Sequence, residues 1–345
     1  MSLINARVEG KIGHVTLTRP KAMNALSEAM LAELAPVLRA WATDDAIALV
    51  VLDAEGEKAF CAGGDIAELH GWGTSGNVDA AREFWRDEYR LNADLFEYPK
   101  PLISLMHGFV MGGGVGLGCH ASHRVVCEST SIAMPESVIG LIPDVGGSWL
   151  LGQAPGRLGE YLGATGKRMN AGDAIYAGFA DGYIPQAKWP DLIERLAETG
   201  DYTLVEQAFE TPPAGKYEAM ASEIDAHFGG ETMGDIIRSL RHEDTEFTRE
   251  TLEIIARNSP ISMNATVELI HRQRRSNLTI WSVLELEYRF TYRAIDDTDF
   301  LEGVRARIID KDNAPKWRHE NAEAVPTVLI SQLLMPLGAA KFTKD

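Results

Sequence analysis

The chain has 345 residues, of which 45% are hydrophobic and 24% charged, and its formal net charge at pH 7 is −17. This composition predicts a soluble globular protein with enough apolar side chains for one large domain or two small ones. The acidic excess argues against nucleic acid as a partner. No apolar run reaches the ~18 residues that span a bilayer, and the N-terminus lacks a targeting pattern. We therefore expect a cytoplasmic protein that binds neither nucleic acid nor a membrane.

The three cysteines are widely spaced in the sequence. Cys61, Cys119 and Cys127 form no C-x-x-C pair, and no histidine cluster stands near them. Zinc sites and disulfide frameworks require such spacings, so we expect neither a metal site nor structural disulfides. Cys61 is a candidate nucleophile by residue type, but small buried cysteines are common and favour a structural role.

The first half of the chain alternates strand-like and helix-like segments. Strand patterns, either alternating or continuously apolar, occur at 12–18, 47–53, 102–107 and 122–127. Ser27 is a predicted N-cap for a helix over 27–42, and a long amphipathic helix is predicted over 79–97. This alternation predicts an α/β sheet with right-handed crossovers.

Beyond about residue 160 the strand-like runs stop. Helical spacing follows at 171–178, 190–199, 217–227, 232–240, 245–257, 263–273 and 280–294. The glycine-rich stretch 70–78 is predicted to be a mobile loop. We expect a mixed core over 1–185 and a helical region over 186–345 that covers the site and mediates packing or association.

Three glycine-rich turns follow strand-like runs, at 60–66, 107–116 and 143–147. Consecutive glycines let backbone N–H groups approach a ligand, and at the start of a helix these groups favour negative charge. Asp65 and Ser148 are predicted helix N-caps. None of the turns matches a phosphate-binding P-loop or a dinucleotide fingerprint, and such a turn alone is more often a tight turn or close packing than an anion site.

Two carboxylates stand beside these turns. Glu136 follows the strand-like Ser131–Pro135, and Asp144 lies eight residues later, between Pro143 and Gly146. A pair of carboxylates next to an apolar element suits general acid–base catalysis, and a close, partly buried pair titrates jointly. The alternative interpretation is two solvated loop acids.

Taken together and in order, these elements resemble the crotonase superfamily of enoyl-CoA hydratases and isomerases. The resemblance covers residues 5–185 and rests on the motifs at 19–26, 62–65, 100–116 and 136–147. It implies a ClpP/crotonase-like α/β spiral of ββα units, with a helical C-terminal region. It also implies an acyl-CoA substrate, no cofactor beyond the coenzyme A of that substrate, and a homo-oligomer, either a trimer or a hexamer.

The resemblance also implies roles for single residues. The backbone N–H groups of Gly64 and Gly113 would form an oxyanion hole for the thioester carbonyl oxygen, where one such donor contributes ~10²–10³ in rate. The coenzyme would be bound by Lys21 as a phosphate contact and by Ala62, Gly63, Asp65 and Ile66. A polyanionic coenzyme on an acidic protein requires such local cations and N–H groups.

The match differs from the hydratases of the family at one glutamate. Hydratases use two glutamates to add water. Glu136 of this chain matches one of them, and Gly116 occupies the position of the other. Glycine transfers no proton, so the difference argues against hydratase activity. The pair of Glu136 and Asp144 is similar to the 3-hydroxyisobutyryl-CoA hydrolase branch, although dienoyl-CoA isomerases carry a similar pair.

Three further segments resemble that hydrolase branch. Residues 84–92 match a helix that supplies a substrate-binding glutamate, here Glu88, which by itself reads as an exposed helix residue. Residues 285–289 and 299–317 also match, and for these we favour helix packing over direct chemistry. The resemblance thus implies hydrolysis of a 3-hydroxyacyl-CoA in valine catabolism. An acyl-CoA isomerase and a non-catalytic acyl-CoA-binding protein are the alternatives.

Overall fold

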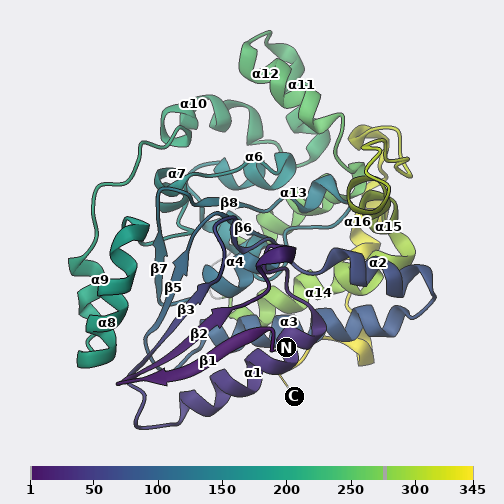
Figure 1. Cartoon of the computed structure of the whole chain (residues 1–345). Helices are drawn as coiled ribbons and strands as arrows, with labels where there is room; N and C mark the ends of the chain where they lie inside the picture. The colour runs from purple at the N-terminus through teal and green to yellow at the C-terminus, as the bar shows by residue number, and fades with distance from the viewer. Residues whose placement is uncertain (1, 275–277, 345) are drawn as a thin grey trace. The chain divides into compact units, whose positions relative to one another are not determined.

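The computed structural model describes residues 2–274 and 278–344 (Figure 1). The chain forms two compact units, each built from three separate segments. Unit 1 comprises Met1–Asp65, Arg90–Ala133 and Arg168–Lys216, and unit 2 comprises Ile66–Tyr89, Met134–Lys167 and Tyr217–Asp345. Both units contain residues from either side of position 185, so the functional division at that residue stays a prediction.

Within the described residues, unit 1 contains a six-stranded sheet with the order β1-β2-β3-β5-β7-β9. The strands are β1 (Ile4–Glu9), β2 (Ile12–Leu17), β3 (Leu49–Ala54), β5 (Leu102–Met106), β7 (His123–Val126) and β9 (Gly182–Tyr183). β1 pairs antiparallel with β2, and every other neighbouring pair is parallel. The four predicted strands are confirmed. The prediction that strands stop near residue 160 is wrong for the short β9, which adds to the edge of the sheet.

Helices pack on both faces of this sheet. One face carries a continuous apolar core from β2, β3, β5 and β7, covered by α8 (Trp189–Thr199) and α9 (Thr203–Gln207). On the other face α1 (Glu28–Ala42) packs so closely that a Cβ atom at Gly13 would lie 2.4 Å from the Trp41 ring. Ser27 caps α1 as predicted, since its side chain accepts a hydrogen bond from the Met30 N–H. Helix α7 (Ala171–Tyr176) completes the unit.

A smaller parallel sheet in unit 1 positions two of the glycine-rich turns. Its strands are β4 (Ala59–Cys61), β6 (Phe109–Met111) and β8 (Ser131–Ala133), in that order. The turn at 62–65 follows β4, and Gly112 leads from β6 into the short helix α4 (Gly113–Gly118). Because the carboxyl ends of neighbouring parallel strands lie at the same edge, the two turns meet there.

Gly114 provides a stability test of this junction. A Cβ atom at this position would lie 2.1 Å from the Cys61 carbonyl oxygen, so α4 contacts β4 without room for a side chain. We expect Gly114→Ala to lower the free energy of unfolding by about 3 kcal/mol. The matched control is Gly71→Ala, where no atom of the described residues lies within 4 Å of the added methyl group. It should stabilise its helix by about 0.5–1 kcal/mol, as measured by denaturant unfolding, and equal effects would contradict the close contact.

Unit 2 is helical in its described residues. Its helices are α2 (Ile66–Thr74), the first turns of α3 (Val78–Phe96), α5 (Gly147–Gln153), α6 (Leu158–Thr165), α10 (Tyr217–Phe228), α11 (Met233–His242), α12 (Glu246–Ile255), α13 (Pro260–Gln273), α14 (Ile280–Asp297), α15 (Phe300–Val304) and α16 (Thr327–Leu333). The predicted helices are confirmed. Helix α13 is buried along most of its length and contacts both α5 and α6, so it forms the centre of the unit.

Two local predictions are wrong. The segment 70–78 is not a loop along its length, because α2 continues to Thr74. A Cβ atom at Gly73 would lie 2.7 Å from Leu301 and 3.1 Å from Ile295, so this glycine allows close packing rather than mobility. Ser148 is not an N-cap either: Gly146 takes that position with φ 79°, and Ser148 lies inside α5.

Candidate active site

Each unit contains one part of the predicted site, and unit 1 contains the two N–H groups. The turn at 62–65 is held by backbone hydrogen bonds from Leu26 N–H to Gly63 and from Asp65 N–H to Leu26, both 2.8 Å. An ideal Cβ atom at Gly63, where φ is 111°, would lie 4.0 Å from the Gly113 nitrogen. The turns carrying Gly64 and Gly113 are therefore in contact. Neither N–H group donates to another residue in the described part of the chain, so both are available to a ligand.

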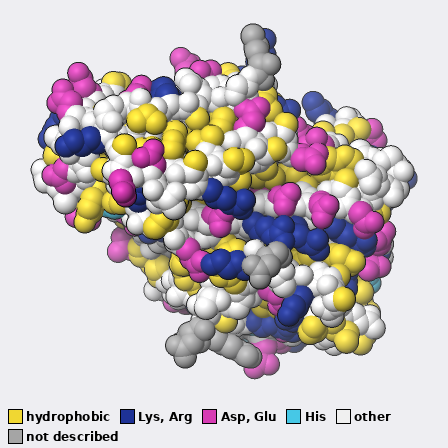
Figure 2. Space-filling view, turned by 90° about the horizontal axis from the view of Figure 1, so that it is seen from below, with side chains coloured by type: hydrophobic (Ala, Val, Ile, Leu, Met, Phe, Trp, Pro, Cys, Tyr) yellow, Lys and Arg dark blue, Asp and Glu magenta, His cyan; other side chains and the backbone are white. Residues whose placement is uncertain are grey.

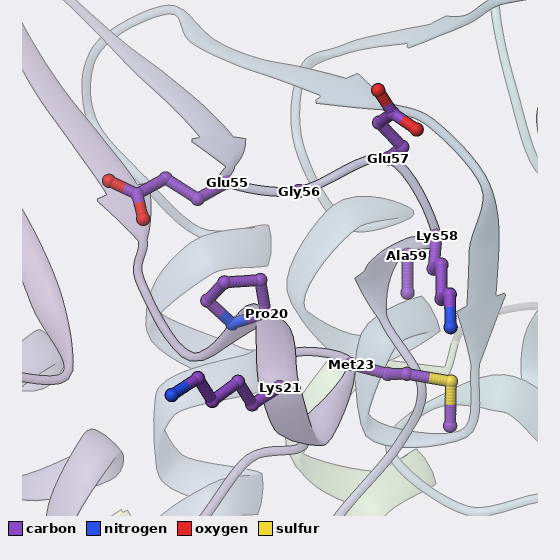
Figure 3. Close-up of a pocket in the computed structure, with 8 residues that line it drawn as sticks. All are labelled: Pro20, Lys21, Met23, Glu55, Gly56, Glu57, Lys58 and Ala59. Atoms are coloured by element: carbon purple, nitrogen blue, oxygen red, sulfur yellow. The ribbon is translucent and has the colours of Figure 1, made fainter.

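The predicted coenzyme contacts occupy three places. Ala62 and Gly63 lie in this turn, and Asp65 forms an ion pair with Arg19 at 2.8 Å. Ile66 is the first residue of α2 and belongs to unit 2. Lys21 lines a cavity of about 350 Å³ in unit 1 (Figure 3).

That cavity carries charges of both signs. Two of its lining residues are lysines, Lys21 from the turn after Pro20 and Lys58 from the loop after β3, and Glu55 and Glu57 line it too. Although the chain is strongly acidic, Lys and Arg side chains occur close together among acidic and apolar side chains on the face shown in Figure 2. Local cations of this kind are what a polyanionic ligand needs on an acidic protein.

Unit 2 brings three predicted carboxylates together. Glu88 lies on α3, Glu136 opens the 3₁₀ turn Glu136–Val138, and Asp144 lies in the loop before α5. All three are buried, with 3%, 5% and 4% of their surface exposed. This rejects the interpretation of Glu136 and Asp144 as solvated loop acids and that of Glu88 as an exposed helix residue. Charge repulsion links Asp144 to both glutamates, so the three act as one cluster.

Two carboxylate oxygens of this cluster lack a partner. Glu88 Oε1 and Glu136 Oε2 are buried and accept no hydrogen bond from any described residue. Such atoms are rare in folded proteins, because a buried polar atom without a partner is destabilising by about 1–3 kcal/mol. Atoms of this kind are suited to bind a hydroxyl group or a water molecule that arrives with the substrate.

Asp144 is fixed by Tyr89 and by its own loop. The Tyr89 hydroxyl donates a 2.8 Å hydrogen bond to Asp144 Oδ2 and lies 3.3 Å from Thr291 Oγ1. The loop continues through Val145, a non-glycine residue at φ 53°, and Gly146 at φ 79°. A β-branched residue in this left-handed region is strained, so surrounding contacts must hold the loop.

Glu287 on α14 supplies those contacts, and it is a site residue that the sequence did not identify. Its carboxylate accepts hydrogen bonds from the Gly146 N–H at 2.8 Å, the Ser148 N–H at 3.1 Å and the Ser148 hydroxyl at 2.5 Å. Glu287 is fully buried. The segment 285–289, for which only packing was expected, therefore anchors the loop that carries Asp144.

Burial sets the electrostatics of the cluster. Burial is the largest of the effects on these groups, and it raises the pKa of Asp144 to about 7 and the pKa of Glu287 to about 8. The pKa of Glu136 is raised well above its ordinary value, first by burial and then by the charge of Asp144. Burial and Asp144 likewise raise the pKa of Glu88. Raised pKa values close to neutrality are what proton transfer at physiological pH requires.

These shifts predict how stability depends on pH. A carboxylate with a raised native pKa binds more protons in the folded than in the unfolded state, so stability falls as pH rises from the unfolded pKa to the folded one. For Asp144 and Glu287 that window runs from about 4 to about 8. Since the pKa of Glu88 is raised too, we expect Glu88→Gln to reduce the stability lost between pH 5 and pH 8, measured by denaturant unfolding at both values.

The matched control for this prediction is an exposed glutamate. Glu198 on α8 is exposed, and Glu198→Gln removes the same formal charge. It should leave the difference in stability between pH 5 and pH 8 as it is in the natural chain. If both variants flatten the pH dependence equally, the loss reflects the overall negative charge and not the buried cluster.

Comparison with known proteins identifies the class to which this fold and site belong. The family model described as enoyl-CoA hydratase/isomerase matches residues 12–334. The chain therefore belongs to the enoyl-CoA hydratase/isomerase family, whose fold is the crotonase fold, as the sequence motifs implied.

Individual relatives match over nearly the whole length. The mitochondrial 3-hydroxyisobutyryl-CoA hydrolase of Gallus gallus is 34% identical over 341 residues, covering 96% of this chain and 88% of the relative. An enoyl-CoA hydratase structure from Rhodobacter sphaeroides 2.4.1 is 50% identical with a TM-score of 0.95, covering 99% of this chain and 100% of its own. A carnitinyl-CoA dehydratase structure from Mycobacterium thermoresistibile is 38% identical with a TM-score of 0.94, covering 100% and 99%. The similarity thus includes the helical C-terminal region.

The location of the protein in the cell stays a prediction. In residues 2–274 and 278–344 no helix combines the length and apolarity needed to cross a membrane. The hydrolase from Gallus gallus is mitochondrial by name, so it gives no support to the predicted cytoplasmic location.

Proposed function

We propose that this protein hydrolyses a 3-hydroxyacyl-CoA thioester, converting 3-hydroxyisobutyryl-CoA and water to 3-hydroxyisobutyrate and coenzyme A, a step of valine catabolism. The observation that carries this proposal is the buried cluster of Glu88, Glu136 and Asp144, in which burial raises the pKa of each carboxyl group. The similarity to 3-hydroxyisobutyryl-CoA hydrolases over 96% of the chain supports the same reaction.

In the proposed mechanism the N–H groups of Gly64 and Gly113 bind the thioester carbonyl oxygen as negative charge develops on it. Glu136 then attacks the carbonyl carbon and expels the thiolate to form a mixed anhydride, which water hydrolyses, or it removes a proton from the water molecule that attacks the thioester. Asp144 orients the attacking water or the substrate hydroxyl and transfers a proton to the leaving thiolate. Each turnover consumes one water molecule and breaks the carbon–sulfur bond.

Glu88 accounts for the choice of a 3-hydroxy acid. Its unpartnered Oε1 atom would accept a hydrogen bond from the distal hydroxyl group of the substrate. A buried polar atom that only the correct substrate satisfies gives strong discrimination against an analogue without the hydroxyl. We propose further that Lys21 and the turn at 62–66 bind the coenzyme, with its phosphates at the lysine-lined cavity of Figure 3.

Hydration of an enoyl-CoA is the second candidate function, because a structure of an enoyl-CoA hydratase is 50% identical to this chain. Gly116 is the argument against it. This residue lies inside α4 and is fully buried, at the position where hydratases of the family have their second glutamate. A site with one of the two required proton-transfer groups is poorly suited to add water to a double bond.

One assay separates these functions. Purified protein is mixed with 3-hydroxyisobutyryl-CoA, a 3-hydroxyacyl-CoA of different chain length, isobutyryl-CoA, an enoyl-CoA and a dienoyl-CoA. Release of thiol and loss of the conjugated double bond are followed in parallel. We expect thiol release from the 3-hydroxyacyl thioesters and much less from isobutyryl-CoA. Hydration or double-bond migration without thiol release would refute the proposal and support a hydratase or an isomerase. Binding without any conversion would indicate a non-catalytic acyl-CoA-binding protein.

A further inference from the structure

The C-terminal tail packs back onto helix α14 within unit 2. Ile330, Leu333 and Leu334 are buried, whereas Val328 is 61% exposed. The three buried side chains of the tail therefore pack inside this unit.

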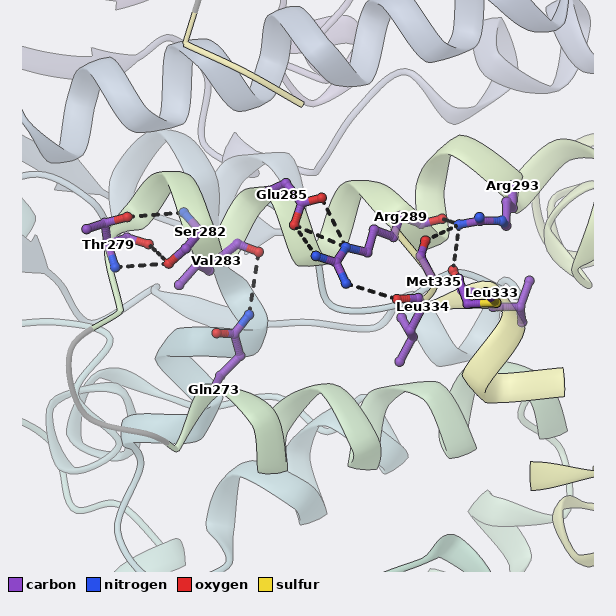
Figure 4. Close-up of polar contacts among 10 residues, drawn as sticks. All are labelled: Gln273, Thr279, Ser282, Val283, Glu285, Arg289, Arg293, Leu333, Leu334 and Met335. Atoms are coloured by element: carbon purple, nitrogen blue, oxygen red, sulfur yellow. Dashed lines mark hydrogen bonds and ion pairs between the residues drawn. The ribbon is translucent and has the colours of Figure 1, made fainter. Parts of the chain in front are cut away.

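Two arginines of α14 hold the end of α16 (Figure 4). Arg289 donates a 3.2 Å hydrogen bond to the Leu334 carbonyl and also pairs with Glu285. Arg293 donates to the carbonyls of Leu333 at 3.1 Å and Met335 at 3.0 Å. Carbonyl groups at the end of a helix have no partner within it, so these arginines stabilise the point from which the tail continues.

Beyond this point Phe342 enters an aromatic cluster. Its ring is stacked on Trp281 at 5.7 Å between centroids, and it lies 5.8 Å from the Tyr288 ring and 6.0 Å from the Tyr89 ring, edge-on to the latter. Phe342 is only 4% exposed, although only three residues follow it in the sequence. Aromatic pairs of this geometry contribute beyond their buried area.

Tyr89 connects this cluster to the carboxylates. Its ring packs against both Phe342 and Tyr288, each 6.0 Å away between centroids, and its hydroxyl group donates to Asp144. The ring is fully buried, so its position depends on the side chains packed against it. Removing the Phe342 ring would leave a cavity beside Tyr89 and give the hydroxyl group freedom to leave Asp144.

We propose that Phe342, in the C-terminal tail, is a positioning residue for Asp144 that acts through Tyr89. Its effect on catalysis rests on the function proposed above, whereas its effect on the state of Asp144 does not. The hydrogen bond from Tyr89 favours the charged form of Asp144, so losing it raises the pKa of that carboxyl group.

The other titratable groups near Asp144 are Glu88 from α3, Glu136 from the 3₁₀ turn and Glu287 from α14. Substitution at position 342 leaves these three residues unchanged. A shift of the titration of Asp144 in such a variant therefore reports on the contact from Tyr89.

The test compares kcat, KM and the pH–rate profile in Phe342→Ala, Phe342→Leu, Tyr89→Phe and the double variant. We expect Phe342→Ala to lower kcat about tenfold, the loss of one hydrogen bond to a charged group, with KM changed less than about threefold. The descending limb of the profile, where Asp144 loses the proton that it transfers to the thiolate, should move to higher pH, and Phe342→Leu should recover most of the activity. In the Tyr89→Phe background, Phe342→Ala should change kcat less than about twofold, since both remove the same contact.

The matched control is Ile330→Ala, which removes buried apolar volume from the same tail. It should lower the melting temperature and leave the pH–rate profile in place. The proposal is overturned if the effects of Phe342→Ala and Tyr89→Phe on kcat multiply, if the profile of Phe342→Ala does not move, or if Ile330→Ala moves it equally.

A measurement without substrate separates this proposal from the proposed function. The pKa of Asp144 is followed by carboxyl ¹³C NMR in protein labelled at aspartate, with Asp144→Asn assigning the signal. A higher pKa in Phe342→Ala supports the positioning role even if the natural chain releases no thiol from any thioester. An unchanged pKa overturns the role even if the hydrolase activity is confirmed.

Discussion

Replacement of Glu136 by Gln should lower kcat for thioester hydrolysis by about 10²–10⁴-fold, the contribution of a general base, with a smaller change in KM. Gln has the shape of Glu but transfers no proton and forms no anhydride. Gln fills the same buried space as Glu136 and carries no charge, so the variant should fold normally. Steady-state thiol release with 3-hydroxyisobutyryl-CoA measures the effect.

The role of Glu136 as a base also predicts how the activity of the natural chain depends on pH. A base must be ionised to act, and burial together with Asp144 raises the pKa of Glu136. Activity should therefore increase with pH, and the ascending limb should lie above the ordinary range of a glutamate. Glu83→Gln, on the exposed side of α3, is the control and should retain full activity. Near-normal turnover of Glu136→Gln would remove Glu136 from the mechanism.

Much of the fold could be predicted because its signals are local. The buried strands β3 and β5 appear as continuous apolar runs, and Ser27 marks the start of α1 by a cap that depends only on the next few residues. The glycines of 70–78 were misread, since a glycine that permits mobility and one that permits close packing look alike in sequence. Gly73 is distinguished by Leu301 and Ile295, far along the chain.

The site could be predicted where family motifs marked it, and Glu287 lay outside those motifs. A signal for it does exist. Helix α14 carries buried residues at helical spacing, and Glu287 lies on that buried stripe together with Leu284 and Thr291. A carboxylate on the apolar face of a helix must be partnered or functional, because burial of an unpaired charge is strongly unfavourable. Glu88 stands beside the buried Trp85 and Tyr89 of α3 and meets the same criterion.

The contact between Phe342 and Tyr89 had no such signal. The two residues are separated by most of the chain, and a single phenylalanine near a terminus has no periodic neighbours to indicate burial. Only the folded arrangement of α3, α14 and the tail reveals that they meet. Side-chain contacts of this kind depend on tertiary packing and cannot be predicted from local sequence patterns.

Replacement of Asp144 by Asn should lower kcat by about 10²-fold or more and move the ascending limb of the pH–rate profile to lower pH. The loss of rate follows because an amide cannot transfer a proton to the leaving thiolate. The shift follows because the charge of Asp144 is the second cause of the raised pKa of Glu136, after burial. Removing that charge makes Glu136 easier to ionise, so its basic form is reached at lower pH.

The direction of this shift distinguishes Asp144 from the positioning residues around it. Tyr89→Phe keeps the carboxyl group and removes a donor, which raises the pKa of Asp144, so it should move the descending limb, which requires protonated Asp144, to higher pH. Both variants weaken the same loop contact, and a general loss of packing would move both limbs in one direction. An ascending limb moved to lower pH by Asp144→Asn, together with a descending limb moved to higher pH by Tyr89→Phe, would therefore mean that one cluster of interacting carboxylates sets the pH dependence. An unmoved limb in Asp144→Asn would show that Glu136 titrates independently, and the proposed division of roles between the two residues would have to be abandoned.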